Sequence, residues 1–362
     1  MAHEAQARYS DLVLAKLRSE LVLADGFVFN NDYEGDPKAG AVKIPVRDTE
    51  VAVSDYDKAN GLAPTTGSTT YTTLVIDKDK AVNEVIDGYD AASVPDNLVA
   101  DRLDSAGYSL ARQLDTDGAT TLLAGATAMS VASLTKDNIY SNIVDIRTAM
   151  SKADVPDDGK RYLLVTPDTF ALILKSPEFI SASDLGDSVK QNGILGKIGG
   201  FLVKEWNDST ANLAMIAGHP RYATRVHEWS VPVKVQDLAQ SGDYIGACAV
   251  QGRRVYGHKV LRAAAIRSVF APGSLTVTLT ASDEGKTIVT VTAGNTGTTY
   301  KYTKNPASRV PYGDAYSGGT SLTSGTTKIA VAEGDVLEIA NLSSNKVVAV
   351  AYVTVTAADI GS

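Results

Sequence analysis

Residues 159–209 read GKRYLLVTPDTFALILKSPEFISASDLGDSVKQNGILGKIGGFLVKEWNDS. Within them, RYLLVT (Arg161–Thr166) is a short apolar run typical of a buried strand. Thr166 and Pro167 fit the start of a helix, with Thr166 as N-cap and Pro167 in the first turn. FLVKEW (Phe201–Trp206) has the pattern of another strand. Further strands are predicted at 213–217, 231–236 and 244–250. Helices and strands therefore intermix, which predicts an α+β fold.

Helical patterns precede this stretch. Apolar residues recur at spacings of three and four over Val94–Leu123, where Gly118 weakens the pattern and marks a place for the helix to end or bend. A second helix is predicted from Thr135 to just before Pro156. An amphipathic helix is predicted over Tyr9–Ala24, and it packs either in the core or as an arm on a neighbouring molecule. The sequence favours neither alternative.

Two strands joined by a long polar connection are predicted between these helical patterns. AVKIPV (Ala41–Val46) and TYTTLVID (Thr70–Asp77) both alternate, and the residues between them include the turn signal Asn60-Gly61. Long connections are uncommon in compact domains and are often functional. An isolated hairpin is only marginally stable. Packing against another subunit would remove that problem.

The composition changes after Pro272. Residues 274–362 contain 16 threonines and no His, Cys, Met, Trp or Phe. Alternating segments separated by turn clusters predict a small antiparallel sandwich of immunoglobulin-like type. The segment lacks the Cys…Trp…Cys framework of antibody domains.

Catalytic and metal-binding motifs are absent from the sequence. The four histidines form no HExxH pattern, and GILGKIGG (Gly193–Gly200) lacks the spacing of a phosphate-binding loop. We therefore expect no catalytic residue, no cofactor and no metal. The net charge of −8 and the missing basic stripe argue against tight nucleic-acid binding. Cys248 is the only cysteine, and no apolar run reaches the roughly 20 residues of a membrane span.

The segment 159–209 and two later ones, AGHPRYA (Ala217–Ala223) and VYGHKVLRAAAI (Val255–Ile266), resemble tailed-bacteriophage major capsid proteins of the Hong Kong 97-type fold. No single motif carries the resemblance, which lies in the order of the elements over residues 1–270. It implies a shell subunit that encloses double-stranded DNA, with a C-terminal immunoglobulin-like domain added to the usual fold.

The resemblance also implies a division of the chain. We expect an N-terminal arm (1–40), an extended hairpin loop (41–80), a peripheral domain with the spine helix (81–134), an axial domain (135–250), a returning peripheral strand (251–272) and the immunoglobulin-like domain (273–362).

Contacts between subunits are expected from apolar residues of the arm and the hairpin: Leu14, Leu17, Leu21, Val42, Ile44, Val46, Tyr56, Tyr71, Leu74 and Ile76. The expected partners are further copies of the chain in pentamers and hexamers, a separate scaffolding protein, a portal protein and a decoration protein. Packaged DNA is expected to make only weak, non-specific contacts, and no membrane is involved. The expected location is the virion, after assembly in the host cytoplasm.

Three other interpretations are open. An encapsulin, which is a bacterial compartment protein, has the same fold but usually lacks an added sandwich. A surface adhesin would explain the threonine-rich sandwich but conflicts with the missing export signal. A hydrolase using His227 and Glu228 is the least favoured.

Overall fold

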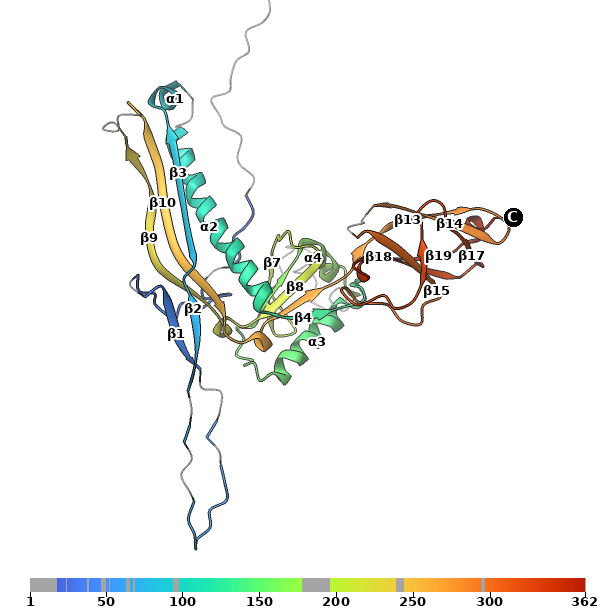
Figure 1. Ribbon diagram of the computed structural model, residues 1–362, viewed down its shortest axis with the longest axis horizontal. Helices are drawn as coiled ribbons and strands as arrows, with labels where there is room; N and C mark the ends of the chain where they lie inside the picture. The colour runs from blue at the N-terminus through green and yellow to red at the C-terminus, as the bar shows by residue number, and fades with distance from the viewer. Residues whose placement is uncertain are drawn as a thin grey trace, which may run out of the picture. The chain divides into compact units, whose positions relative to one another are not determined.

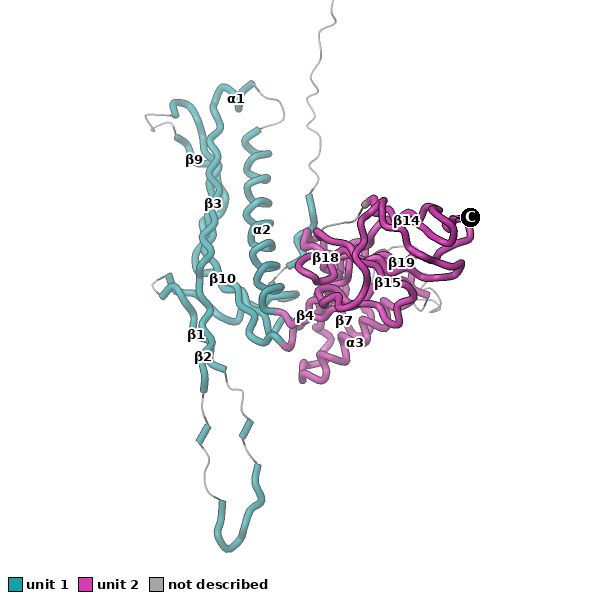
Figure 2. The backbone as a smooth tube through the Cα atoms, turned by 45° about the vertical axis from the view of Figure 1, so that its right-hand side comes forward, with its two compact units in different colours: residues 1–125, 219–263 teal, residues 126–218, 264–362 magenta. Residues whose placement is uncertain are grey.

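The computed structural model describes residues 18–23, 25–37, 39–46, 50–51, 53–62, 66–67, 69–93, 98–177, 196–238, 244–293 and 297–361. The chain forms two compact units, each made from two separate stretches (Figure 2). Unit 1 consists of Met1–Gly125 and His219–Ala263, and unit 2 consists of Ala126–Gly218 and Ala264–Ser362.

The centre of unit 1 is an antiparallel sheet with the strand order β3-β10-β9 (Figure 1). These strands span Lys78–Ile86, Cys248–Val260 and Ala223–Asp237. The short helix α1, Gly88–Ser93, follows β3, and the long helix α2, Leu98–Gly125, packs along the sheet.

The stripe that α2 buries is the one that its apolar spacing predicts. Its buried residues are Ala106, Leu110, Leu114, Gly118, Ala119 and Leu122. The helix does not end at Gly118 but continues to Gly125. A Cβ at Gly118 would lie only 3.0 Å from the ring of Phe29, so glycine lets this ring pack closely against the helix without a shift.

A two-stranded hairpin of β1 (Ala41–Val46) and β2 (Thr70–Val75) completes unit 1. The strands are antiparallel, and their register runs from Ala41 opposite Val75 to Val46 opposite Thr70. Both strands lie where the alternating sequence predicts them.

Unit 2 contains a six-stranded sheet with the order β4-β11-β8-β5-β7-β6. In this order its strands span Thr127–Ser130, Arg267–Phe270, Leu213–Gly218, Tyr162–Val165, Phe201–Glu205 and Lys197–Ile198. All four residues of β5 are buried, as its apolar run predicts. Two helices belong to this part: α3 (Ile139–Lys152) buries Ile143 and Met150, and α4 (Pro167–Leu174) has the proline in its first turn.

The rest of unit 2 is a sandwich of two sheets, with strand orders β12-β19-β18-β15-β16 and β13-β14-β17. The strands are Gly273–Ser274, Lys346–Thr354, Val336–Ser343, Thr299–Lys304 and Thr320–Leu322 in the first sheet, and Thr276–Ala281, Lys286–Ala293 and Lys328–Ala330 in the second. One apolar core joins them, because Val289 and Ile329 pack in the same cluster as Leu337 and Ile339.

The helix predicted over Tyr9–Ala24 falls mostly outside the described residues. The described part, residues 18–23, forms no helix. Val22 and Leu23 are nevertheless buried, although they lie outside any helix or strand.

The two units cut across the expected domain bounds. All of β9 and the start of β10, expected within 135–250, belong to unit 1 and pair with each other and with β3. Conversely, β4 and β11, expected in 81–134 and 251–272, pair with each other in the sheet of unit 2. A strand pattern predicts extended chain but not the sheet that the strand joins, because long-range pairing makes that choice.

Candidate functional site

The root of the hairpin packs inside unit 1. Ile44 and Leu74 are fully buried in a cluster with Val226, and Val42 and Ile76 are partly buried against it. The backbone of β10 approaches closely at Gly257, where a Cβ would lie 2.6 Å from the carbonyl oxygen of Val75. Glycine therefore allows the hairpin to lie directly on the sheet.

The connection between β1 and β2 exposes large apolar side chains. The exposed fractions are 84% for Val51, 97% for Val53, 72% for Tyr56 and 55% for Leu62. Surface apolar residues are common singly, but four exposed ones within one twelve-residue segment are a local concentration.

An ordered turn organises this segment at Asp57. Its carboxylate accepts hydrogen bonds from the Ala59 amide at 2.8 Å and from the Asn60 side chain at 2.6 Å, and its carbonyl accepts from the Gly61 amide at 2.8 Å. The Ala59 amide, followed by the Asn60 side chain, lowers the pKa of Asp57. Gly61 has a φ of 67°, which suits glycine. We call residues 50–51 and 53–62 the hairpin tip.

The ten residues expected at subunit contacts therefore divide into groups. Tyr56 and Tyr71 are exposed, whereas Ile44 and Leu74 belong to the core of their own chain. Leu21, Val42, Val46 and Ile76 are partly buried. Leu14 and Leu17 lie outside the described residues. Val51, Val53 and Leu62 are also exposed, and no pattern in the sequence singles them out, because they stand in a polar segment without strand periodicity.

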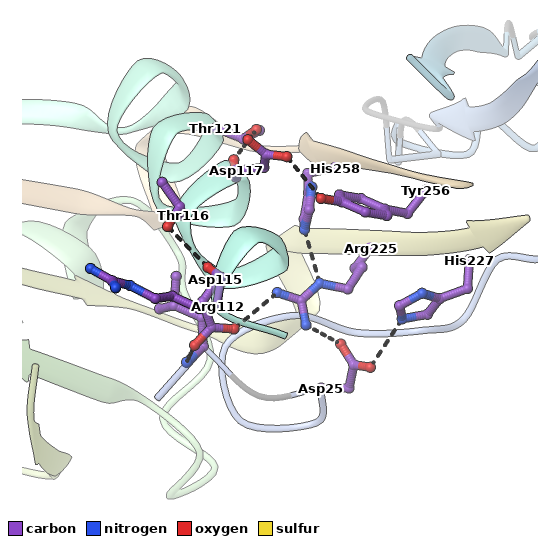
Figure 3. Close-up of polar contacts among 11 residues, drawn as sticks. Asp25, Arg112, Asp115, Thr116, Asp117, Thr121, Arg225, His227, Tyr256 and His258 are labelled. Carbon is purple, nitrogen blue, oxygen red and sulfur yellow. Dashed lines mark hydrogen bonds and ion pairs between the residues drawn. The ribbon is translucent and has the colours of Figure 1, made fainter. Parts of the chain in front are cut away.

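A buried polar cluster fixes the segment before the hairpin (Figure 3). Arg225 on β9 is 2% exposed, and its Nη1 donates to Asp25 Oδ1 at 2.8 Å. Its Nε donates to His258 Nε2 at 2.9 Å, and its Nη2 lies 3.8 Å from Asp115 Oδ1 on α2. The guanidinium also lies over the Phe29 ring, with Cζ 4.6 Å from the ring centre.

Main-chain contacts reinforce this attachment. The Leu23 amide donates to Asp115 Oδ2 at 3.2 Å, and the Asn30 amide donates to the Ala223 carbonyl at 2.9 Å. The Arg225 amide in turn donates to the carbonyl of Asn30 at 3.0 Å. Leu23 is therefore tied to α2, and Asp25 and Asn30 are tied to β9.

The electrostatics of the cluster follow from its burial. Burial first, and then the charge of Arg225, lowers the pKa of His258 to about 3. Burial works to raise the pKa of Asp25, but the His227 hydrogen bond and the Arg225 charge outweigh it, and that pKa is lowered. For Asp115, burial dominates and raises the pKa. The cluster therefore holds a neutral imidazole beside a charged guanidinium.

This geometry is structural and does not resemble a hydrolytic site. Nε2 of His258 already accepts from Arg225, so its lone pair is occupied. His227 Nε2 lies 3.3 Å from Asp25 Oδ2, and no hydrogen bond joins it to Glu228 in the described residues. The pairing of His227 with Glu228, which the least favoured interpretation requires, is therefore not seen in the described residues. The described residues also contain no group of three or more His, Cys, Asp or Glu side chains placed to hold a metal ion.

The described helices include none that is both long and apolar enough to cross a membrane.

The fold as a whole defines a class of proteins. A three-stranded sheet carrying a long helix, a projecting hairpin and a six-stranded sheet form the Hong Kong 97-type capsid fold. A structure from Mycobacterium phage Che8 matches with a TM-score of 0.62 at 24% identity, covering 73% of this chain and 96% of that one. The capsid of cyanophage P-SCSP1u matches with a TM-score of 0.60 at 13% identity, covering 73% and 92%. The capsid of Myoviridae phage XM1 matches with a TM-score of 0.53 at 18% identity, covering 73% and 96%.

The family model described as phage capsid protein matches residues 84–269, which is just over half of the chain. The chain belongs to this family, and it is a capsid shell protein of a tailed phage. No curated protein matches the sequence.

Proposed function

We propose that the hairpin tip of each subunit docks on an adjacent copy of the chain and so links the subunits of the head shell. The observation that carries this proposal is the set of exposed apolar side chains at residues 51, 53, 56 and 62, on a segment with an ordered turn. A shell subunit repeats every contact many times, so contacts of modest strength together give a stable particle.

The test is a double variant, Val53→Ser with Tyr56→Ser. Neither side chain is buried in its own chain, so the monomer should fold normally while particle formation falls by at least about tenfold. Circular dichroism reports the fold, and sedimentation with electron microscopy reports particles, both in the presence of the scaffolding protein.

The matched control is Leu74→Ser, which removes a fully buried side chain from the root of the same hairpin. It should destabilise the monomer itself by about 3 kcal/mol. An unchanged particle yield in the Val53→Ser, Tyr56→Ser variant would contradict the proposal, irrespective of the result for Leu74→Ser.

The finer assignments belong to the same proposal. The C-terminal sandwich is an immunoglobulin-like module, supported by the neighbouring order β15-β18-β19 in one sheet and by the parallel pairing of β12 with β19. The three-stranded sheet with α2 is the peripheral domain, and the six-stranded sheet is the axial domain. The segment before β1 is the N-terminal arm, held at residues 22–30 by the Arg225 cluster.

The proposed partners follow from a shell subunit that is not an enzyme. Copies assemble into pentamers and hexamers in the host cytoplasm, with a scaffolding protein and a portal protein, and a decoration protein binds outside. The net charge of −8 favours weak contact with packaged double-stranded DNA, because strong binding of phosphates would resist movement of the DNA.

A further inference from the structure

A buried carboxylate in the C-terminal sandwich has no role in the contacts described above. Glu338 on β18 is 1% exposed, and its Oε1 accepts a hydrogen bond from the Tyr316 hydroxyl at 2.7 Å. Thr303 on β15 lies 2.7 Å from the same hydroxyl. A buried carboxylate is costly unless it is hydrogen-bonded, so this arrangement calls for an explanation.

Tyr316 belongs to the connection between β15 and β16, residues 305–319, which we call the strut. Tyr316 is itself 2% exposed, and three main-chain bonds anchor the strut to β19 and to Asn345 in the turn just before it. The Gly313 amide donates to Val347 at 2.8 Å, the Val347 amide to Asp314 at 3.0 Å, and the Tyr316 amide to Asn345 at 3.1 Å. The strut is therefore ordered along its C-terminal half.

A second part of the strut reaches the six-stranded sheet and the loop that follows β4. Arg309 Nη1 donates to Ser133 Oγ at 2.7 Å. The Tyr312 ring stacks on Phe270 of β11, with ring centres 5.7 Å apart and planes 20° from parallel. The Tyr312 amide also donates to the Val131 carbonyl at 3.4 Å.

Tyr352 contacts both parts of the strut: Arg309 lies over its ring, and Tyr352 packs against the apolar cluster that contains Tyr316. It lies opposite Glu338 on the neighbouring strand β19, and the Arg309 guanidinium lies over its ring at 4.4 Å. Burial, followed by the Glu338 carboxylate, raises the pKa of Tyr352. Glu338 therefore contacts the residue that anchors the strut and lies beside the residue on which Arg309 rests.

We propose that the strut couples the sandwich to the six-stranded sheet, and that Glu338 is the positioning residue that holds the strut in place. The sandwich then has two connections to that sheet, the strut and the chain at residues 271–273. Domains joined by a single linker move relative to one another by default, and a second, ordered connection restricts that motion. The proposal is independent of the hairpin contacts, because no residue of unit 1 takes part.

Three variants of the full chain test it. Glu338→Leu removes the acceptor and puts an apolar side chain of similar size in its place, which buried strands tolerate. Glu338→Gln keeps an oxygen that can accept from Tyr316 and serves as the rescue. Glu333→Gln is the matched control, because Glu333 is exposed in the same sandwich.

Hydrogen exchange of the purified protein gives the first measurement. In Glu338→Leu, the amides of Tyr312, Gly313 and Tyr316 should exchange at least about tenfold faster, while Ile339 and Ala351 in the core strands keep their rates. Glu338→Gln and Glu333→Gln should stay close to the unchanged protein. Unaltered strut exchange in Glu338→Leu would overturn the proposal, and so would equal acceleration of the core strands, because that indicates a purely structural role.

Electron microscopy of assembled particles gives the second measurement. Arg309→Ala leaves the sandwich core intact and removes the contact with Ser133, so the sandwich density should weaken relative to the six-stranded sheet. Sandwich density that stays as sharp as in the unchanged particle would overturn the coupling. If a variant forms no particles, the exchange measurement on the soluble chain still decides.

Discussion

At the scale of single residues, the Arg225 cluster shows how one buried charge fixes a terminal segment. Asp25 and Asp115 come from the N-terminal segment and from α2, and Arg225 and His258 come from two paired strands. Four distant parts of the sequence therefore meet at one guanidinium. No residue spacing in the sequence predicts such a cluster, because its members are brought together only by strand pairing and helix packing.

Arg225→Leu should lower the free energy of unfolding by about 3 kcal/mol, because it leaves two carboxylates without their buried cation. Chemical denaturation measures the change. Arg253→Leu is the matched control: Arg253 also pairs with an aspartate, Asp79, but both side chains are half exposed. Its effect should be much smaller, since solvent screens such pairs. Equal losses in the two variants would contradict the importance assigned to burial.

His258 should make unfolding depend on pH. Its pKa is about 3 in the folded chain against 6.5 for a free histidine, so the unfolded chain binds the extra proton between these values. The stabilising contribution is complete above pH 6.5 and is lost as the pH falls towards 3. The slope from this residue should approach about 1.4 kcal/mol per pH unit.

Denaturation of His258→Gln between pH 7.5 and 4 checks this dependence. Glutamine still offers an oxygen to Arg225 but does not titrate, so the curve should be flatter than that of the unchanged protein by roughly that slope. The lowered pKa of Asp25 also costs stability on acidification, while the raised pKa of Asp115 acts in the opposite direction. Identical pH profiles for the two proteins would rule out His258 as the titrating group.

At the scale of elements, the sequence predicts local structure well and pairing poorly. The strands of the hairpin, β5 and the stripe of α2 follow directly from apolar spacing. The membership of β4, β9 and β11 in their sheets does not, because it depends on contacts with strands far away in the chain. The hairpin tip illustrates the same limit: the sequence predicts a long connection, but only the structure shows that its apolar residues have no cover in their own unit.

The docking of the hairpin on the sheet should depend on Gly257. In Gly257→Ala, the new methyl group would lie 2.6 Å from the carbonyl oxygen of Val75 and 2.9 Å from Leu74 Cδ2, so β2 must shift. Hydrogen exchange in β1 and β2 should then accelerate, with α2 unaffected. Gly67→Ala is the control, because nothing lies within 4 Å of the added atom and exchange should not change. Unchanged exchange in β1 and β2 of the first variant would show that the contact is not tight.

At the scale of the whole molecule, the segment that matches the capsid family and the C-terminal sandwich occupy successive parts of the sequence. The phage capsid family model ends at residue 269, and the Che8 phage structure is covered to 96% by 73% of this chain. The sandwich begins at β12, Gly273–Ser274, and has its own apolar core with contributions from both sheets. The residues that match the capsid family model therefore do not include the sandwich.

A chain that ends at residue 272 should still form particles, because the hairpin, the long helix and the six-stranded sheet all precede that point. The separate fragment 273–362 should unfold in a single cooperative transition, since its core draws on no residue outside the sandwich. Electron microscopy of the shorter chain and calorimetry of the fragment measure these outcomes. The shorter particles should melt at a somewhat lower temperature than full-length particles. Removing the strut takes away the Tyr312 ring that stacks on Phe270 and the hydrogen bond from Arg309 to Ser133. Failure of the shorter, folded chain to assemble would show instead that the sandwich takes part in closing the shell.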